Sequence, residues 1–107
     1  MDAGKTASQA GHAYVGAFVR CQDRAILDAY HQDFPQSPGT KVCLKAKNLD
    51  QLLRAEAAAK EAGIPCFLVV DSGCPNFFNG EPTITALGIG PATKDQVKHI
   101  TKKFQLL

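Results

Sequence analysis

Long hydrophobic runs are absent from this sequence: none approaches the ~20 apolar residues that a membrane-spanning helix needs. The first residues also lack the charged and apolar regions of a secretory signal, and no internal repeat or low-complexity segment is visible. Hydrophobic residues make up 45% and charged residues 21% of the chain, a composition that argues against disorder. We therefore expect a single domain over residues 1–107 that works in the cytoplasm and has no membrane partner.

The cysteines lack the spacing of a metal site. Cys21, Cys43, Cys66 and Cys74 include no CxxC pair and have no cluster of histidines beside them. We interpret them as small apolar residues of a reduced protein, except for Cys74, which follows Asp71 in a loop. No metal and no cofactor is predicted. A serine flanked by the glycines of a nucleophile elbow is also missing, which argues against a covalent seryl intermediate.

The chain has no large excess of one charge, since its formal net charge is only +2. Its basic residues are nevertheless unevenly placed. Lys94, Lys98 and Lys102 repeat at i, i+4 and i+8 along one face of the closing segment, where Asp95 is the one acidic residue. Such a face suits contact with a phosphate backbone. A solvated helix face is the other interpretation, and the sequence leaves both open.

The periodicity of apolar residues predicts the order helix, strand, helix, strand, strand, helix. Asn48 with Gln51, and Thr93 with Gln96, have the spacing of helix-starting pairs, and Gly63 is suited to end a helix. The pattern indicates an α/β fold of three layers, α/β/α, with a small mixed sheet of three to four strands flanked by helices. We expect helices over 5–21 (with a pattern extending toward residue 30), 48–62 and from 93 onward, strands over 41–46, 65–70 and 83–89, and loops over 33–40 and 72–82. Because the run over 65–70 is continuously apolar, it is predicted to lie in the middle of the sheet with both faces covered.

The first helix carries reactive side chains in a polar stripe. Lys5, Gln9 and His12 stand at i, i+4 and i+7 and therefore share one face of a helix. On helix statistics alone this stripe is more often a solvated face than a site. The opposite face is apolar and is expected to pack on the core; it holds Ala7, Ala10, Tyr14, Ala17, Phe18 and Cys21.

Four separated segments, taken together and in order, carry a family resemblance. They are Lys5 with Ala7 and Gln9, the pair His12-Ala13, an apolar strand ending in Asp71, and the run TITALGIGP over 83–91. This arrangement resembles the type 2 peptidyl-tRNA hydrolase family along the whole chain. The resemblance implies an esterase that cleaves the bond between a peptide and the 3′ end of tRNA, with peptidyl-tRNA as its partner. It also implies that Lys5 and Asp71 are central to the reaction.

Ester hydrolysis needs an activated water and a group that stabilises the developing oxyanion. Ligands of open α/β sheets lie beyond the carboxyl ends of parallel strands, where we place Asp71. Asp71 would orient or deprotonate the water, Lys5 would stabilise the oxyanion, and Gln9 and His12 would position them. An aspartate followed by Ser-Gly is also a common turn former. Residues expected in loops near the site are Gly73, Cys74, Thr85, Gly88 and Gly90, although the last two also suit a tight strand-to-helix connection.

Two departures from the family pattern matter for function. The family's opening strand, roughly Val-Val-Arg, would precede Met1, so we expect a sheet with an open edge that favours a homodimer. A start site placed too far downstream, a trimmed chain or a sheet that manages with fewer strands would each account for this. After Asp71, Gly73-Cys74-Pro75-Asn76 stands where the family has Gly-Arg-Thr-Gln or a close variant. The alternative function is therefore a non-catalytic α/β module that binds RNA or a protein.

Overall fold

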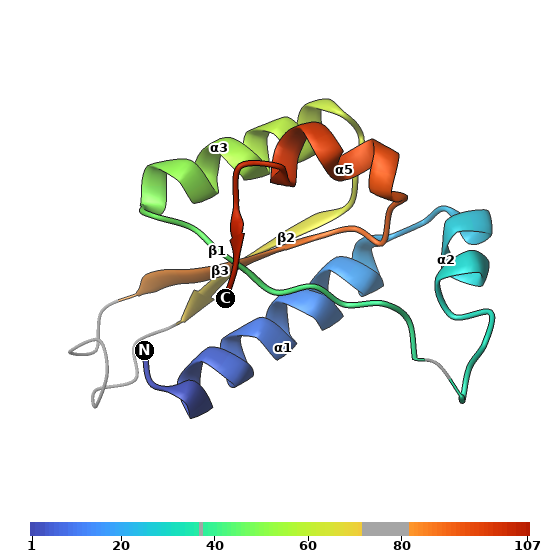
Figure 1. The fold of residues 1–107 in the computed structure, drawn as a ribbon, viewed down its shortest axis with the longest axis horizontal. Helices are drawn as coiled ribbons and strands as arrows, with labels where there is room; N and C mark the ends of the chain where they lie inside the picture. The colour runs from blue at the N-terminus through green and yellow to red at the C-terminus, as the bar shows by residue number, and fades with distance from the viewer. Residues whose placement is uncertain (37, 72–81) are drawn as a thin grey trace.

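The computed structural model describes residues 1–36, 38–71 and 82–107. Four helices and four strands are described, and the ribbon shows their order along the chain (Figure 1). The elements are α1 (Ala3–Arg20), α2 (Arg24–Tyr30), β1 (Leu44–Lys45), α3 (Leu49–Glu61), β2 (Cys66–Asp71), β3 (Thr83–Ile89), α5 (Lys94–Thr101) and β4 (Gln105–Leu106). None of the described helices is long and apolar enough to cross a membrane. The loop predicted over 72–82 lies outside the described residues except for Pro82.

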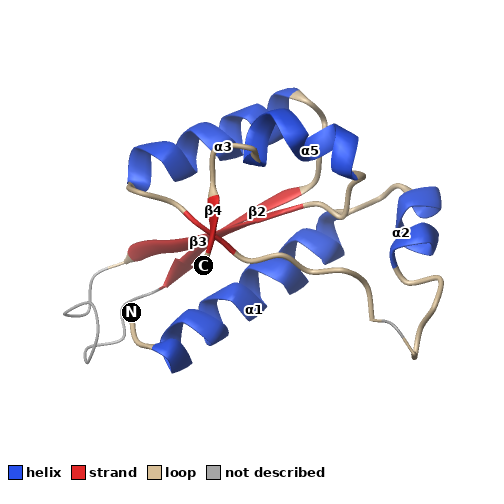
Figure 2. Cartoon of the chain, viewed as in Figure 1, coloured by secondary structure: helices blue, strands red, loops and turns tan. Residues whose placement is uncertain are grey.

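Three layers build the molecule. The β2–β3 hairpin is the middle layer, α1 packs on one of its faces, and α3 with α5 covers the other (Figure 2). Between the hairpin and these two helices lies a core centred on Ala59, Ile64 and Ile100, against which Leu87 and Ile89 of β3 pack. The predicted α/β fold with three layers is thus confirmed. Because helices lie on both faces of β2, the apolar character of that strand is explained.

The arrangement of strands differs from the prediction of one small mixed sheet. The described strands form two antiparallel pairs, β2 with β3 and β1 with β4. In the first pair Cys66 stands opposite Ile89 and Asp71 opposite Thr83, with a register shift between Val69 and Val70. The expected parallel strand end at Asp71 is therefore wrong, because too few residues separate β2 from β3 for a parallel crossover, which needs ~12 or more. The sequence pattern also does not predict the short β4.

The hairpin is also not the centre of a larger sheet among the described residues. Each of its strands pairs with the other alone, so both have an edge without a strand partner there. Val70, on β2, is 51% exposed. The prediction that the segment over 65–70 lies in the middle of a sheet is therefore wrong for the part of the chain that the structure describes, although its helical cover is as expected.

Helix α1 sits on the hairpin through its smallest residues. Its buried positions are Gln9, Ala13 and Ala17, spaced one turn apart. The backbone of Gly88 on β3 approaches Ala13 so closely that a Cβ at Gly88 would overlap the carbonyl oxygen of Ala13. The predicted apolar stripe is confirmed only in part. Its members Ala17 and Cys21 are buried, but Ala7 is exposed, and the ring of Phe18 lies beside the contact, where it packs near Tyr30 of α2.

The helix ends follow from local sequence. Asn48 accepts a hydrogen bond from the backbone N–H of Gln51 at 2.8 Å to start α3, and Gly63 follows that helix with φ of +72°. Thr93 and Gln96 form the predicted reciprocal capping box of α5. The first predicted helix ends earlier than its pattern indicated, at Arg20, because Asp23 caps a separate α2. Burial raises the pKa of the Cys66 thiol, in keeping with its interpretation as an apolar filler.

Candidate active site

The start of α1 is fixed by a cap that also sets the position of the site lysine. The side chain of Asp2 accepts a hydrogen bond from the backbone N–H of Lys5 at 2.8 Å, so the helix begins at Ala3. Lys5 therefore stands in the first turn and Gln9 one turn later on the same face. Both side chains point from α1 toward the end of the β2–β3 hairpin where β2 finishes.

Asp71, the last residue of β2, accepts hydrogen bonds from both of these side chains. Lys5 Nζ lies 2.6 Å from Asp71 Oδ2, and Gln9 Nε2 lies 3.1 Å from the same oxygen. The residues are 66 and 62 positions away from Asp71 in sequence. The fold thus brings together the lysine and the aspartate that the sequence singled out.

The Lys5–Asp71 ion pair is shielded from water. The two side chains retain 12% and 13% of their exposure, whereas the ion pair of Arg24 with Asp28 on α2 retains 87% and 63%. An ion pair removed from solvent is screened less, and its geometry is held more firmly than that of a surface pair. Removing one partner of this partly buried pair would leave the other charge with less compensation than it has now.

Gln9 is oriented by a hydroxyl on β3. Thr85 Oγ1 donates to Gln9 Oε1 at 2.6 Å, which turns the amide N–H toward Asp71. Because Gln9 is only 3% exposed, an incorrect amide orientation would leave buried polar groups unpaired. Three elements, α1, β2 and β3, therefore contribute to one hydrogen-bonded chain that runs from Thr85 through Gln9 to Asp71.

This arrangement supports hydrolytic chemistry without a covalent intermediate. A carboxylate held in one orientation can accept a proton from water, and an ammonium beside it can stabilise negative charge that develops on a carbonyl oxygen. Among the described residues, no three His, Cys, Asp or Glu side chains gather as they would around a metal ion. The groups present are those of acid–base and electrostatic catalysis.

Comparison with known proteins agrees with this chemistry. A family model described as peptidyl-tRNA hydrolase PTH2 matches residues 1–107. The chain belongs to the PTH2 family. Curated relatives named peptidyl-tRNA hydrolase include that of Methanopyrus kandleri, 36% identical over 107 residues that cover 100% of this chain and 88% of the relative. The protein of Methanothermobacter thermautotrophicus is 38% identical over 107 residues, 100% and 89% of the two chains, and that of Sulfolobus acidocaldarius is 33% identical over 110 residues, 100% and 90%.

Not every residue predicted for this PTH2 site lies at Asp71. His12 is exposed on α1, and its proposed positioning role stays a prediction. Gly88 and Gly90 lie toward the opposite end of the hairpin, since Gly88 stands opposite Phe67 and the N–H of Gly90 donates to Pro65 O at 2.7 Å. Gly73 and Cys74 are outside the described residues, so the loop predicted near the site is not placed.

Sequence reasoning did not foresee the role of Thr85. The sequence places it only as a neighbour of the site, yet its hydroxyl is the group that orients Gln9. The signal lay in the alternation of β3, because Thr83 and Thr85 are two residues apart and therefore share one face of the strand. A pair of threonines at the start of an otherwise apolar strand marks the part of that face which meets polar side chains of α1.

Proposed function

We propose that this chain hydrolyses the ester that joins a peptide to the 3′ end of a tRNA, with Lys5 and Asp71 in the reaction. The distance of 2.6 Å between Lys5 Nζ and Asp71 Oδ2 is the observation that carries the proposal. It unites two residues that the family resemblance names, in a shielded position where charge acts strongly. Membership of the PTH2 family supports the substrate class.

In this mechanism a water molecule attacks the ester carbonyl carbon. Asp71 accepts the proton that the water loses, and Lys5 stabilises the oxyanion of the tetrahedral intermediate. The carbon–oxygen bond to the ribose then breaks, and the proton passes from Asp71 to the departing ribose oxygen, which becomes a hydroxyl group. The products are a peptide with a free carboxyl group and a deacylated tRNA. Gln9, oriented by Thr85, keeps the carboxylate in place during these steps.

Cleavage of peptidyl-tRNA by the purified chain tests the proposal. We expect release of peptide by the wild-type protein and a loss of ~10²-fold or more in turnover for Lys5→Ala, with a smaller change in tRNA binding. Lys60→Ala is the matched control, because Lys60 is 63% exposed on α3 and its ion pair is with Glu56, one helical turn away on the same helix. A wild-type protein that binds tRNA but releases no peptide would instead favour the non-catalytic binding module.

We also propose that α5 contacts the tRNA backbone. Lys94, Lys98 and Lys102 are all exposed and follow one another by a helical turn. Replacing all three by alanine should flatten the dependence of log Kd on log salt by roughly 0.7–0.9 for each phosphate that the protein no longer neutralises. An unchanged slope would mean that these lysines only solvate the helix. Because peptidyl-tRNA arises from translation, we propose that the protein acts in the cytoplasm.

A further inference from the structure

A small groove outside the Lys5–Asp71 site is bordered by three lysines from two parts of the chain. It has a volume of about 170 Å³ and lies between the β1–β4 pair, the start of α3 and the turn after α5. This volume is below the range of roughly 300–1,000 Å³ that pockets for drug-sized molecules have, so it suits a single small group. Its walls are formed by Lys45, Ala46, Lys47, Gln51, Lys103 and Gln105.

The lysines of this groove come from both sides of the β1–β4 pair. Lys45 is on β1, where it stands directly opposite Gln105. Lys47 follows β1 and Lys103 precedes β4, and both line the same groove. Three cations that border one small space repel one another. The nearby carboxylate of Asp50 does not line the groove, and it accepts instead from Arg54 Nε at 3.0 Å. The positive charge is therefore not offset by a carboxylate among the groove's described walls.

The start of α3 adds donors to the same place. Gln51 Oε1 accepts from the backbone N–H of Lys47 at 2.7 Å, which holds the amide of Gln51 against the wall of the groove. With its oxygen engaged in this bond, the amide offers N–H donors. The N-terminus of the 13-residue α3 contributes partial positive charge as well. Each of these polar features thus favours an anion.

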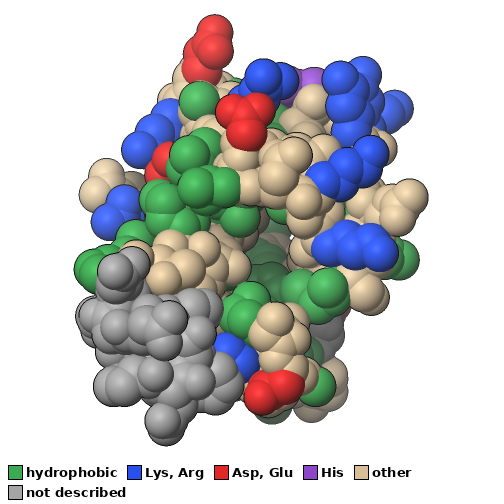
Figure 3. Space-filling model, turned by 90° about the vertical axis from the view of Figure 1, so that its left-hand side faces the viewer, with side chains coloured by type: hydrophobic (Ala, Val, Ile, Leu, Met, Phe, Trp, Pro, Cys, Tyr) green, Lys and Arg blue, Asp and Glu red, His purple; other side chains and the backbone are tan. Residues whose placement is uncertain are grey.

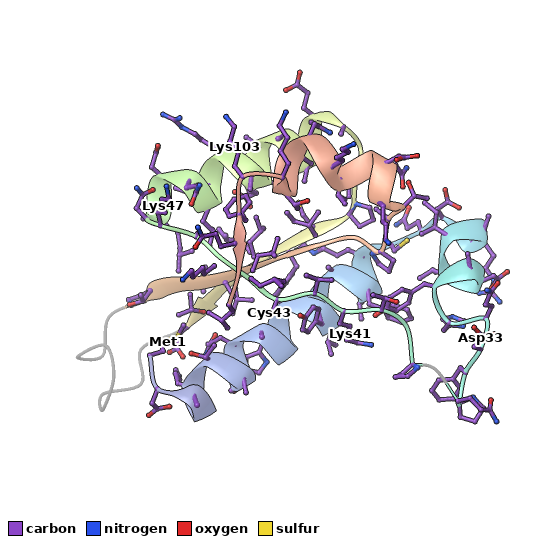
Figure 4. The ribbon with its side chains drawn as sticks, in the orientation of Figure 1. Met1, Asp33, Lys41, Cys43, Lys47 and Lys103 are labelled. Atoms are coloured by element: carbon purple, nitrogen blue, oxygen red, sulfur yellow. The ribbon has the colours of Figure 1, made fainter. Side chains whose placement is uncertain are left out.

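The groove lies at the end of the molecule that carries the candidate active site. Lys47 and Met1 are labelled at the same end of the long axis in Figure 4, and α1 with its Lys5 begins close to Met1. Figure 3 views this end directly: Lys and Arg side chains gather along one edge of the face, beside a hollow. A nucleic acid whose 3′ end reaches Asp71 could therefore present its backbone to the groove.

We propose that the groove of Lys45, Lys47 and Lys103 binds a backbone phosphate of the tRNA while its 3′ end occupies the Lys5–Asp71 site. The inference rests on the proposed function for the identity of the nucleic acid. Exposed lysines hold a lone phosphate ion weakly, whereas a phosphate that belongs to a polymer is kept near the groove by the polymer's other contacts. The shared chemistry is a phosphate group, and its two possible sources are a nucleic acid and free inorganic phosphate.

The test compares two triple variants that lose the same charge. Lys45→Ala/Lys47→Ala/Lys103→Ala removes the groove lysines, and the control Arg24→Ala/Lys41→Ala/Lys60→Ala removes exposed cations elsewhere. Binding of deacylated tRNA is measured over a range of salt concentrations. The groove variant should bind more weakly than the control, and its salt slope should fall by roughly 0.9 for each phosphate that is no longer neutralised. Equal affinities and slopes in the two variants would overturn the proposal.

Cleavage with two substrates separates this proposal from the proposed activity. For peptidyl-tRNA the groove variant should show a raised KM with unchanged kcat, and for an N-acylated aminoacyl-adenosine, which has no backbone phosphate, it should match the wild type. If the wild type cleaves neither ester while the groove variant alone loses tRNA binding, the activity fails and the groove stands. Inorganic phosphate provides the last comparison. If it raises the melting temperature of the wild type but not of the groove variant, and both proteins bind tRNA equally, the groove binds free phosphate. The proposal then fails.

Discussion

At the scale of single residues, the site depends on a chain of hydrogen bonds rather than on one contact. Asp71 accepts from Lys5 and Gln9 at one oxygen, and Gln9 is in turn oriented by Thr85. The spacing of Lys5 and Gln9 on a helix could be predicted from sequence, because it needs only helical periodicity. The distance from either to Asp71 could not, because it depends on how α1 and β2 pack.

Thr85→Val tests whether Thr85 acts in the reaction by orienting Gln9 or only stabilises the folded protein. The variant keeps the shape of the side chain but loses the donor to Gln9 Oε1, so a buried amide oxygen is left unpaired, at a cost of about 1–3 kcal/mol in stability. We expect kcat for peptidyl-tRNA to fall while KM changes little, since the carboxylate is held less firmly. Thr85→Ser restores the hydroxyl and should recover kcat. Equal kcat in Thr85→Val and the wild type would show that Gln9 needs no such support.

At the scale of elements, the close fit between α1 and the hairpin determines which face of α1 is buried. Gly88 lets the backbone of β3 approach Ala13, and this contact turns Gln9 toward the sheet. The predicted apolar stripe shares Ala17 with the buried face but omits Gln9 and Ala13, and close packing of backbones requires small residues at the contact. The helices α3 and α5, their N-terminal caps and the bounds of β3 could be predicted because local sequence decides them. Strand pairing could not, because it depends on contacts distant in sequence.

A matched pair of glycine substitutions measures this fit. In Gly88→Ala the added methyl group would overlap the carbonyl oxygen of Ala13, so we expect a loss of about 1–3 kcal/mol in the free energy of unfolding. In Gly11→Ala the new methyl group meets none of the described residues within 4 Å, and the change removes a glycine from the middle of α1, which should stabilise the protein by about 0.5–1 kcal/mol. Urea denaturation of both variants provides the measurement. Similar changes in the two would mean that α1 does not lie tightly on β3.

At the scale of the whole molecule, the described strands leave open edges. The β2–β3 and β1–β4 pairs are separate, so neither sheet closes on itself or is flanked by a further described strand. Edges of this kind invite pairing with another chain. Two expectations stay predictions. The first is that the 107 residues form one domain, with which the family match over residues 1–107 agrees. The second is that two copies of the chain associate.

Self-association through the hairpin edge can be tested with one substitution. Val70 is 51% exposed on β2, and a lysine at this position places a charge on the edge strand. In sedimentation experiments we expect the wild-type chain to form a dimer and Val70→Lys to shift it toward the monomer, with little change in secondary structure. Val15→Lys, at an exposed position of α1, serves as the control and should remain dimeric. A wild-type chain that stays monomeric at all concentrations would contradict the prediction.

The central claim is that Lys5 and Asp71 act together on the ester, and a single-turnover double-mutant cycle tests it most directly. Peptide release is measured for Lys5→Ala, Asp71→Asn and the double variant, with Asp28→Asn, an exposed aspartate on α2, as the control for the carboxylate change. Folding of each variant is checked by circular dichroism below its melting temperature. We predict a loss of ~10²-fold or more in each single variant and a double variant no more than slightly slower, because the two residues act as one unit. Wild-type rates of peptide release in either single variant would contradict the account.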